Sequence, residues 1–197
     1  MFSVSLCGKL FADRRAREFA NLFILPREEF MPISELLLPE FDQEMKTTRI
    51  TLERVPFDKK GFAPHPKSMP LDKLAPHVAE LAGFAAIVLT TPELDFSAAG
   101  NRERPPFELA GLMKAFDENV AKARAALQNT KDDAWLQPWK LTFQGKPIFA
   151  GSRFMAYRQM FLNHLVHHRA QLGVYLRLND KPLPATYGPS ADDTMGF

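Results

Sequence analysis

The chain has 197 residues and a mass of 22.3 kDa, a length that suits one domain with an ordinary hydrophobic core. Hydrophobic residues make up 46% of it and charged residues 24%, which excludes wholesale disorder. The formal net charge of +2 is too small to imply nucleic acid as a partner, since such binding normally needs a concentrated basic stripe. Because no apolar run reaches the roughly 18 residues needed to cross a bilayer, we expect no membrane span.

The single cysteine, Cys7, allows no intramolecular disulfide and is compatible with a reducing compartment. The N-terminal region does not resemble a secretory signal, because Arg14, Arg15 and Arg17 follow its apolar stretch instead of preceding it. We therefore expect the protein to be cytoplasmic.

Residues 1–30 differ in pattern from the rest of the chain. They mix Phe, Leu and Arg without a clean period, so they form either an amphipathic helix or an N-terminal extension outside the core. From Met31 onward the apolar residues recur at helical spacing. We therefore place the folded domain at residues 31–197.

Four amphipathic helices are predicted from apolar residues three and four positions apart. The first ends at Pro56, the second follows Pro70, the third covers about 109–127, and the fourth about 152–179. Their stripes are Leu38, Phe41, Met45, Thr48, Leu52 and Val55; Leu74, His77, Leu81, Phe84 and Val88; Leu109, Met113, Phe116, Val120, Ala123 and Leu127; and Phe154, Tyr157, Phe161, His164, His168 and Tyr175. Pro76 either kinks the second helix early or delays its regular part to about Ala75.

The connections between these helices are long and rich in proline and glycine. Residues 56–69 have loop chemistry, and another polar stretch with prolines precedes the third helix. Between the third and fourth helices, residues 129–152 alternate around Gln144 and Gly145, which predicts a short hairpin or extended loop. The chain is thus predicted to be all-α, a four-helix bundle with a hairpin or extended loop before the last helix.

Three of the five histidines lie on apolar stripes. His164 and His168 are four residues apart, the spacing at which two imidazoles on one helix face bind one ion. His77 takes a stripe position on another helix, and a bundle brings such positions together. We therefore predict one metal ion bound by His77, His164 and His168. The alternative is that each is a core residue satisfied by a hydrogen bond.

The remaining histidines are expected not to be ligands. His167 should point toward the flank of the fourth helix, and His65, in a proline-rich loop, should be solvated. Three neutral imidazoles suit Zn, Ni, Fe or Cu better than Ca or Mg, and they leave a coordination position for water or substrate. No catalytic acid or base is identifiable, although Tyr157 and Arg158 lie near the right face.

Three segments resemble the DinB-like proteins, a bacterial group unrelated to the lesion-bypass polymerase of that name. NHLVHHRAQLGVYLRLN, from Asn163 to Asn179, looks like the final helix of that family. KPLPATYGPSADD, from Lys181 to Asp193, is similar to the tail of one subfamily. RVPFDKKGFAPHPKSMPLDKLAPHVAEL, from Arg54 to Leu81, resembles the first metal-ligand region, and the likeness covers about residue 31 to the end.

The resemblance implies a bundle that is often homodimeric, with His77, His164 and His168 on one divalent transition metal, zinc before nickel or iron. It also implies a metal-dependent, thiol-using transferase or isomerase, and we expect a transferase in detoxification or stress response. Such an enzyme would join an electrophile to a small thiol such as bacillithiol, mycothiol or glutathione. The alternatives are a metal-dependent hydrolase and a non-catalytic metal-binding stress-response protein. Pro76 departs from the family, which usually has a better helix former there, and residues 1–30 have no counterpart in it.

Overall fold

The computed structural model describes residues 30–98 and 104–196. The chain divides into two compact units, residues 1–31 and 32–197, and every described helix and strand belongs to the second. The two alternatives expected for the N-terminal extension fall on residues 1–29, outside the described residues.

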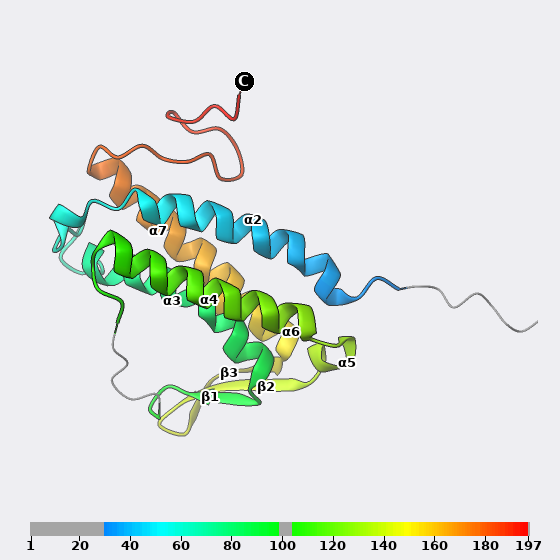
Figure 1. Cartoon of the computed structure of the whole chain (residues 1–197). Coiled ribbons are helices and arrows are strands. Elements are labelled where there is room, and N and C mark those ends of the chain that lie inside the picture. The colour runs from blue at the N-terminus through cyan, green and yellow to red at the C-terminus, as the bar shows by residue number, and fades with distance from the viewer. Residues whose placement is uncertain (1–29, 99–103, 197) are drawn as a thin grey trace, which may run out of the picture. The chain divides into compact units, whose positions relative to one another are not determined.

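Four long helices form a bundle (Figure 1). They are α2 (Ile33–Glu53), α3 (Leu71–Thr90), α4 (Leu109–Asn129) and α7 (Asn163–Leu178). Both α2 and α3 pack against α4 and against α7, so the four helices surround one hydrophobic core. The predicted all-α four-helix bundle is confirmed.

Contacts between the helices give their directions. The ion pairs Arg49–Asp117 and Arg124–Asp42 make α2 and α4 antiparallel. The pairs Arg158–Glu40 and Arg169–Glu44 show that the last helical run is parallel to α2. The contacts of His168 with His77 and of Arg153 with Thr91 show that it is antiparallel to α3. It follows that α3 and α4 are parallel, so α3 ends at the opposite end of the bundle from the one where α4 begins. The segment between them is one of the long connections that the sequence predicts.

A small sheet lies beside one end of the bundle (Figure 1). It contains β1 (Glu93–Asp95), β2 (Pro138–Phe143) and β3 (Lys146–Ser152) in that order, with β1 parallel and β3 antiparallel to β2. Gln144 and Gly145 both have positive φ, 50° and 73°, as a tight hairpin turn requires. The predicted hairpin is confirmed, whereas β1 lies in a stretch that was predicted only as a polar connection.

The short elements lie between the long ones. They are a 3₁₀ turn, η1 (Phe57–Lys59), after α2; one turn of helix, α5 (Asp132–Trp135), after α4; and α6 (Arg153–Ala156) and the π-helical segment η2 (Tyr157–Leu162), which lead into α7. The fourth predicted helix is therefore a continuous helical run with a π segment inside it. Such segments are rare and often lie near functional sites.

The start of α3 is held by the loop after η1. The first two amide groups of the helix donate to the carbonyls of Phe62 and Lys60, at 2.9 and 3.0 Å, so donors that a helix start leaves free are satisfied. The helix then continues through Pro76, which is buried. The regular helix thus begins at Leu71 and places His77 in its second turn.

Among the described residues, α3 is the one helix that is long and apolar enough to cross a membrane by length and composition alone, with a mean hydropathy of 1.3. However, 56% of the 18-residue apolar stretch of this helix is buried inside the protein. Its apolar residues pack against α4 and α7, so α3 has the composition expected of the central helix in a bundle.

A buried ion pair joins α7 to α2. The guanidinium of Arg169 lies 2.6 Å from a carboxylate oxygen of Glu44, and the two side chains are only 4% and 9% exposed. Arg169 also donates to the hydroxyl of Thr48 and to the hydroxyl of Tyr187, which in turn donates to Glu44. Each charge is thus paired and hydrogen-bonded, as a buried charge must be.

The segment after α7 closes over this ion pair. Tyr187 reaches it from the C-terminal tail, and the ring lies 5.6 Å from the Arg169 guanidinium. Asp192 pairs with Arg177 of α7 and also accepts from the amide of Leu183, which shapes the tail into a folded loop. The tail is therefore part of the packed structure.

We expect Arg169→Met to destabilise the protein by about 3–5 kcal/mol in urea unfolding, because it leaves the Glu44 carboxylate buried without a partner. The double variant Arg169→Met/Glu44→Leu should recover most of that loss, since it removes both charges. Arg124→Met is the matched control: its ion pair with Asp42 is exposed to solvent and should contribute little to stability. A loss no larger for Arg169→Met than for this control would contradict the importance of the buried pair.

Candidate metal centre

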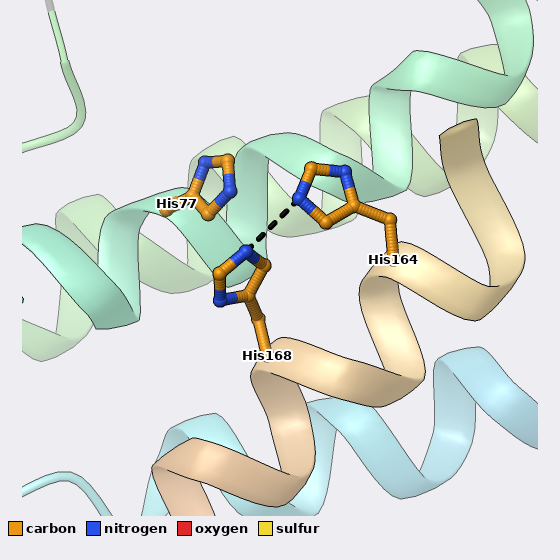
Figure 2. A group of neighbouring side chains, drawn as sticks. All are labelled: His77, His164 and His168. Atoms are coloured by element: carbon orange, nitrogen blue, oxygen red, sulfur yellow. Dashed lines mark hydrogen bonds between the residues drawn. The ribbon is translucent and has the colours of Figure 1, made fainter. Parts of the chain in front are cut away.

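Two adjacent antiparallel helices position the three predicted histidines. His77 projects from the second turn of α3, and His164 and His168 project from the first two turns of α7. Figure 2 shows the three rings pointing toward one another across the gap between the helices. The His77 ring centroid lies 5.3 Å from that of His164 and 4.5 Å from that of His168, and one ligand nitrogen from each residue lies within 4.8 Å of the others.

Hydrogen bonds to the Nδ1 atoms orient the His164 and His168 rings of α7. Nδ1 of His168 lies 2.8 Å from the amide oxygen of Gln171, and Nδ1 of His164 lies 3.4 Å from the carbonyl of Met160. Both partners are acceptors, so a neutral ring that donates to its partner from Nδ1 keeps the lone pair of its Nε2 free for a metal ion. These two Nε2 atoms face each other at 2.9 Å.

Two lone pairs at this distance repel unless a cation lies close to both. A proton or a metal ion can meet that need, and His77 brings a third nitrogen to the same place. Within the described part of the chain, no carboxylate or thiol belongs to this group. The three histidines therefore form a group that could hold a metal ion, and its all-imidazole donors fit a transition metal better than Ca or Mg.

The three histidines are kept in the neutral form that a metal requires. Burial lowers the pKa of His77 to about 4, helped by repulsion from His168 and His164 and from the Arg104 guanidinium. Burial is also the main cause that lowers the pKa of His164 and of His168. Near neutral pH all three rings are therefore uncharged and free to act as ligands.

The other two histidines lie outside the cluster. His167 is exposed, and its Nε2 accepts a hydrogen bond from the side-chain amide of Gln171 at 3.0 Å. His65 is exposed in the loop before α3, where its Nδ1 accepts from the backbone amide of Lys67. Neither takes part in the group formed by the three inward-facing rings.

The two side chains considered as an acid or base make other contacts. Arg158 pairs with Glu40 of α2, at 2.8 Å. Tyr157 is fully buried against the rings of Trp135 and Phe161, and burial together with the Glu40 charge raises the pKa of its hydroxyl. A hydroxyl that holds its proton this strongly is a poor acid or base near neutral pH.

Sequence reasoning overlooked Gln171 and Arg104. Gln171 lies three residues after His168 and four after His167, and this spacing on a helix was a usable signal. Arg104 lies in the connection before α4, and no local pattern relates it to His77. Its influence on the pKa of His77 arises only in the folded chain.

Neither a family model nor a curated protein sequence matches the chain. Several solved structures are similar to it, among them two DinB-like proteins. A DinB-like protein, YjoA, from Bacillus subtilis is 19% identical, with a TM-score of 0.56 over 74% of this chain and 92% of that one. A DinB-like protein from Bacillus cereus is 18% identical, with a TM-score of 0.61 over 80% of this chain and 99% of that one. At such identities the likeness concerns the backbone, and on that basis this chain has the DinB-like fold.

Proposed function

We propose that the protein binds one divalent transition metal, zinc before nickel or iron, through His77, His164 and His168. We further propose that it acts as a thiol-dependent transferase in detoxification or stress response. The observation that carries metal binding is the convergence of three imidazoles: the Nε2 atoms of His164 and His168 lie 2.9 Å apart, and a nitrogen of His77 lies beside them. Three protein ligands leave room for an exchangeable one, which is the pattern of catalytic sites.

A divalent ion at this site would lower the pKa of a thiol or a water toward neutrality. The surrounding residues suit an anionic co-substrate. The positive charge of Arg104 is near enough to lower the pKa of His77, and it would attract a carboxylate-bearing thiol such as glutathione, bacillithiol or mycothiol. Partial burial of the three rings reduces the water that competes for the reactive sulfur.

Removing the metal should lower the melting temperature without unfolding the protein. At a free zinc concentration about a hundred times the dissociation constant, binding adds about 2.7 kcal/mol to stability, whereas the bundle keeps its own buried core. A thermal melt followed by circular dichroism, with and without chelator, measures this. His168→Ala should reproduce the shift and become insensitive to chelator, and His65→Ala, in the exposed loop, should behave as wild type. Loss of all helical signal on chelation would contradict this expectation.

The same melts should depend on pH in a defined direction. Unfolded histidines titrate near 6.5, whereas burial lowers the folded pKa of His77 to about 4 and lowers that of His164 and His168. Zinc stabilisation should thus persist below pH 6.5 and fade as pH approaches about 4. Without metal, the unfolded chain binds more protons in this window, so stability should fall as pH decreases through it. In His77→Ala that fall should be smaller.

The transferase proposal predicts conjugation of an aryl halide to a small thiol. The zinc- or nickel-loaded protein, tested with bacillithiol, mycothiol and glutathione, should exceed His168→Ala by at least about tenfold, equivalent to 1.36 kcal/mol of barrier. Hydrolysis of an activated ester without thiol turnover would instead identify a hydrolase. Tight metal binding with neither activity would identify a non-catalytic metal-binding protein.

We propose that the protein is a cytoplasmic homodimer. Exposed apolar residues on α7 support an interface there, since Val174 and Leu178 are each 55% exposed and lie one turn apart. Multi-angle light scattering at micromolar concentration should give twice the 22.3 kDa chain mass. Val174→Lys should shift the mass toward the monomer, whereas a monomeric wild type would contradict the proposal.

A further inference from the structure

We propose that Gln171 is a positioning residue for the metal centre. Its amide oxygen holds the His168 ring through Nδ1–H, and its amide nitrogen is held in turn by His167. The inference rests on the proposed metal binding and extends the site beyond the three ligands. It also gives a role to His167, which is not one of the three clustered histidines: it accepts a hydrogen bond from the Gln171 amide nitrogen.

The geometry of α7 makes this bridge possible. Gln171 is three residues after His168 and four after His167, so its side chain lies beside both rings on the helix surface. Its Oε1 is 2.8 Å from Nδ1 of His168, and its Nε2 is 3.0 Å from Nε2 of His167. The ring centroids of His167 and His168 are 4.8 Å apart, and the ring planes are nearly perpendicular, at 74°. One amide group thus connects two neighbouring rings.

The polarity of the amide determines which nitrogen of His168 carries the hydrogen. With Oε1 toward His168, the ring must donate from Nδ1, so Nε2 keeps its lone pair for the metal. The reversed amide would place an N–H group against Nδ1, and the hydrogen would move to Nε2 and block coordination. In the observed orientation the amide nitrogen donates to Nε2 of His167, which requires the His167 tautomer that carries its hydrogen on Nδ1.

The two ligands from α7 are oriented by different means. The partner of His164 is the backbone carbonyl of Met160, at a longer 3.4 Å, and no side-chain substitution removes it. The partner of His168 is the side chain of Gln171, which can be replaced. Since Gln171 is exposed, its substitution should leave the melting temperature close to that of the wild type.

Four variants test the proposal: Gln171→Leu, Gln171→Glu, His167→Ala and Gln128→Leu. The last is a matched control, an exposed glutamine on α4.

Zinc affinity is measured by competition with a chelator of known affinity. Gln171→Leu should weaken binding 10- to 100-fold, the usual effect of losing a hydrogen bond to a ligand histidine. Gln171→Glu should match or exceed wild type, since a carboxylate accepts more strongly. His167→Ala should have a smaller effect than Gln171→Leu, and Gln128→Leu should have none.

A second measurement separates this inference from metal binding itself. Nitrogen-15 NMR of the metal-free protein reports the tautomer of His168, which should be Nδ1–H in wild type and Gln171→Glu, and a mixture in Gln171→Leu. Zinc affinity equal in wild type and Gln171→Leu, or a tautomer unchanged by that substitution, would overturn the role of Gln171. If wild type binds no zinc, the proposed function fails, and the NMR result still decides whether Gln171 sets the tautomer.

Discussion

The orientation of α7 about its own axis depends on the buried ion pair between Arg169 and Glu44. Arg169 is nearly inaccessible to water and points at α2. Successive residues on a helix are rotated by about 100°, so fixing Arg169 toward α2 also fixes where His168 points. That direction is toward α3, where His77 lies. A rotation of α7 that moved the histidines out of register would pull a charge away from its partner inside the core, which is costly.

The fold was largely predictable because it depends on periodic apolar stripes. Helical spacing located the four long helices, and the pair Gln144–Gly145 located the hairpin. The exceptions have specific physical causes. A three-residue strand such as β1 has no periodicity of its own and exists because it pairs with β2, more than forty residues later. Arginine and glutamate usually lie on the surface, so the sequence predicts Arg169 and Glu44 to be exposed. Their burial depends on the ion pair that they form with each other.

The candidate site was predictable to a similar degree. The four-residue interval between His164 and His168 depends only on local helix geometry, and His77 could be added because bundle stripes face inward. Which outer nitrogens carry hydrogens could not be inferred, since that depends on Met160 and Gln171 as acceptors. The depressed pKa of His77 likewise reflects burial and Arg104, which come together only in the folded chain.

The ion pair also constrains the order in which the protein can fold. Glu44 and Arg169 are separated by 125 residues, and Tyr187, which bonds to both, is eighteen residues further along the chain than Arg169. During synthesis α2, α3 and α4 emerge from the ribosome before the cation that lets Glu44 leave water. A three-helix intermediate must therefore keep this face of α2 open, and the core can close only after nearly the whole chain is available. The bundle can therefore fold as a single cooperative unit only after α7 and the C-terminal tail have been synthesised.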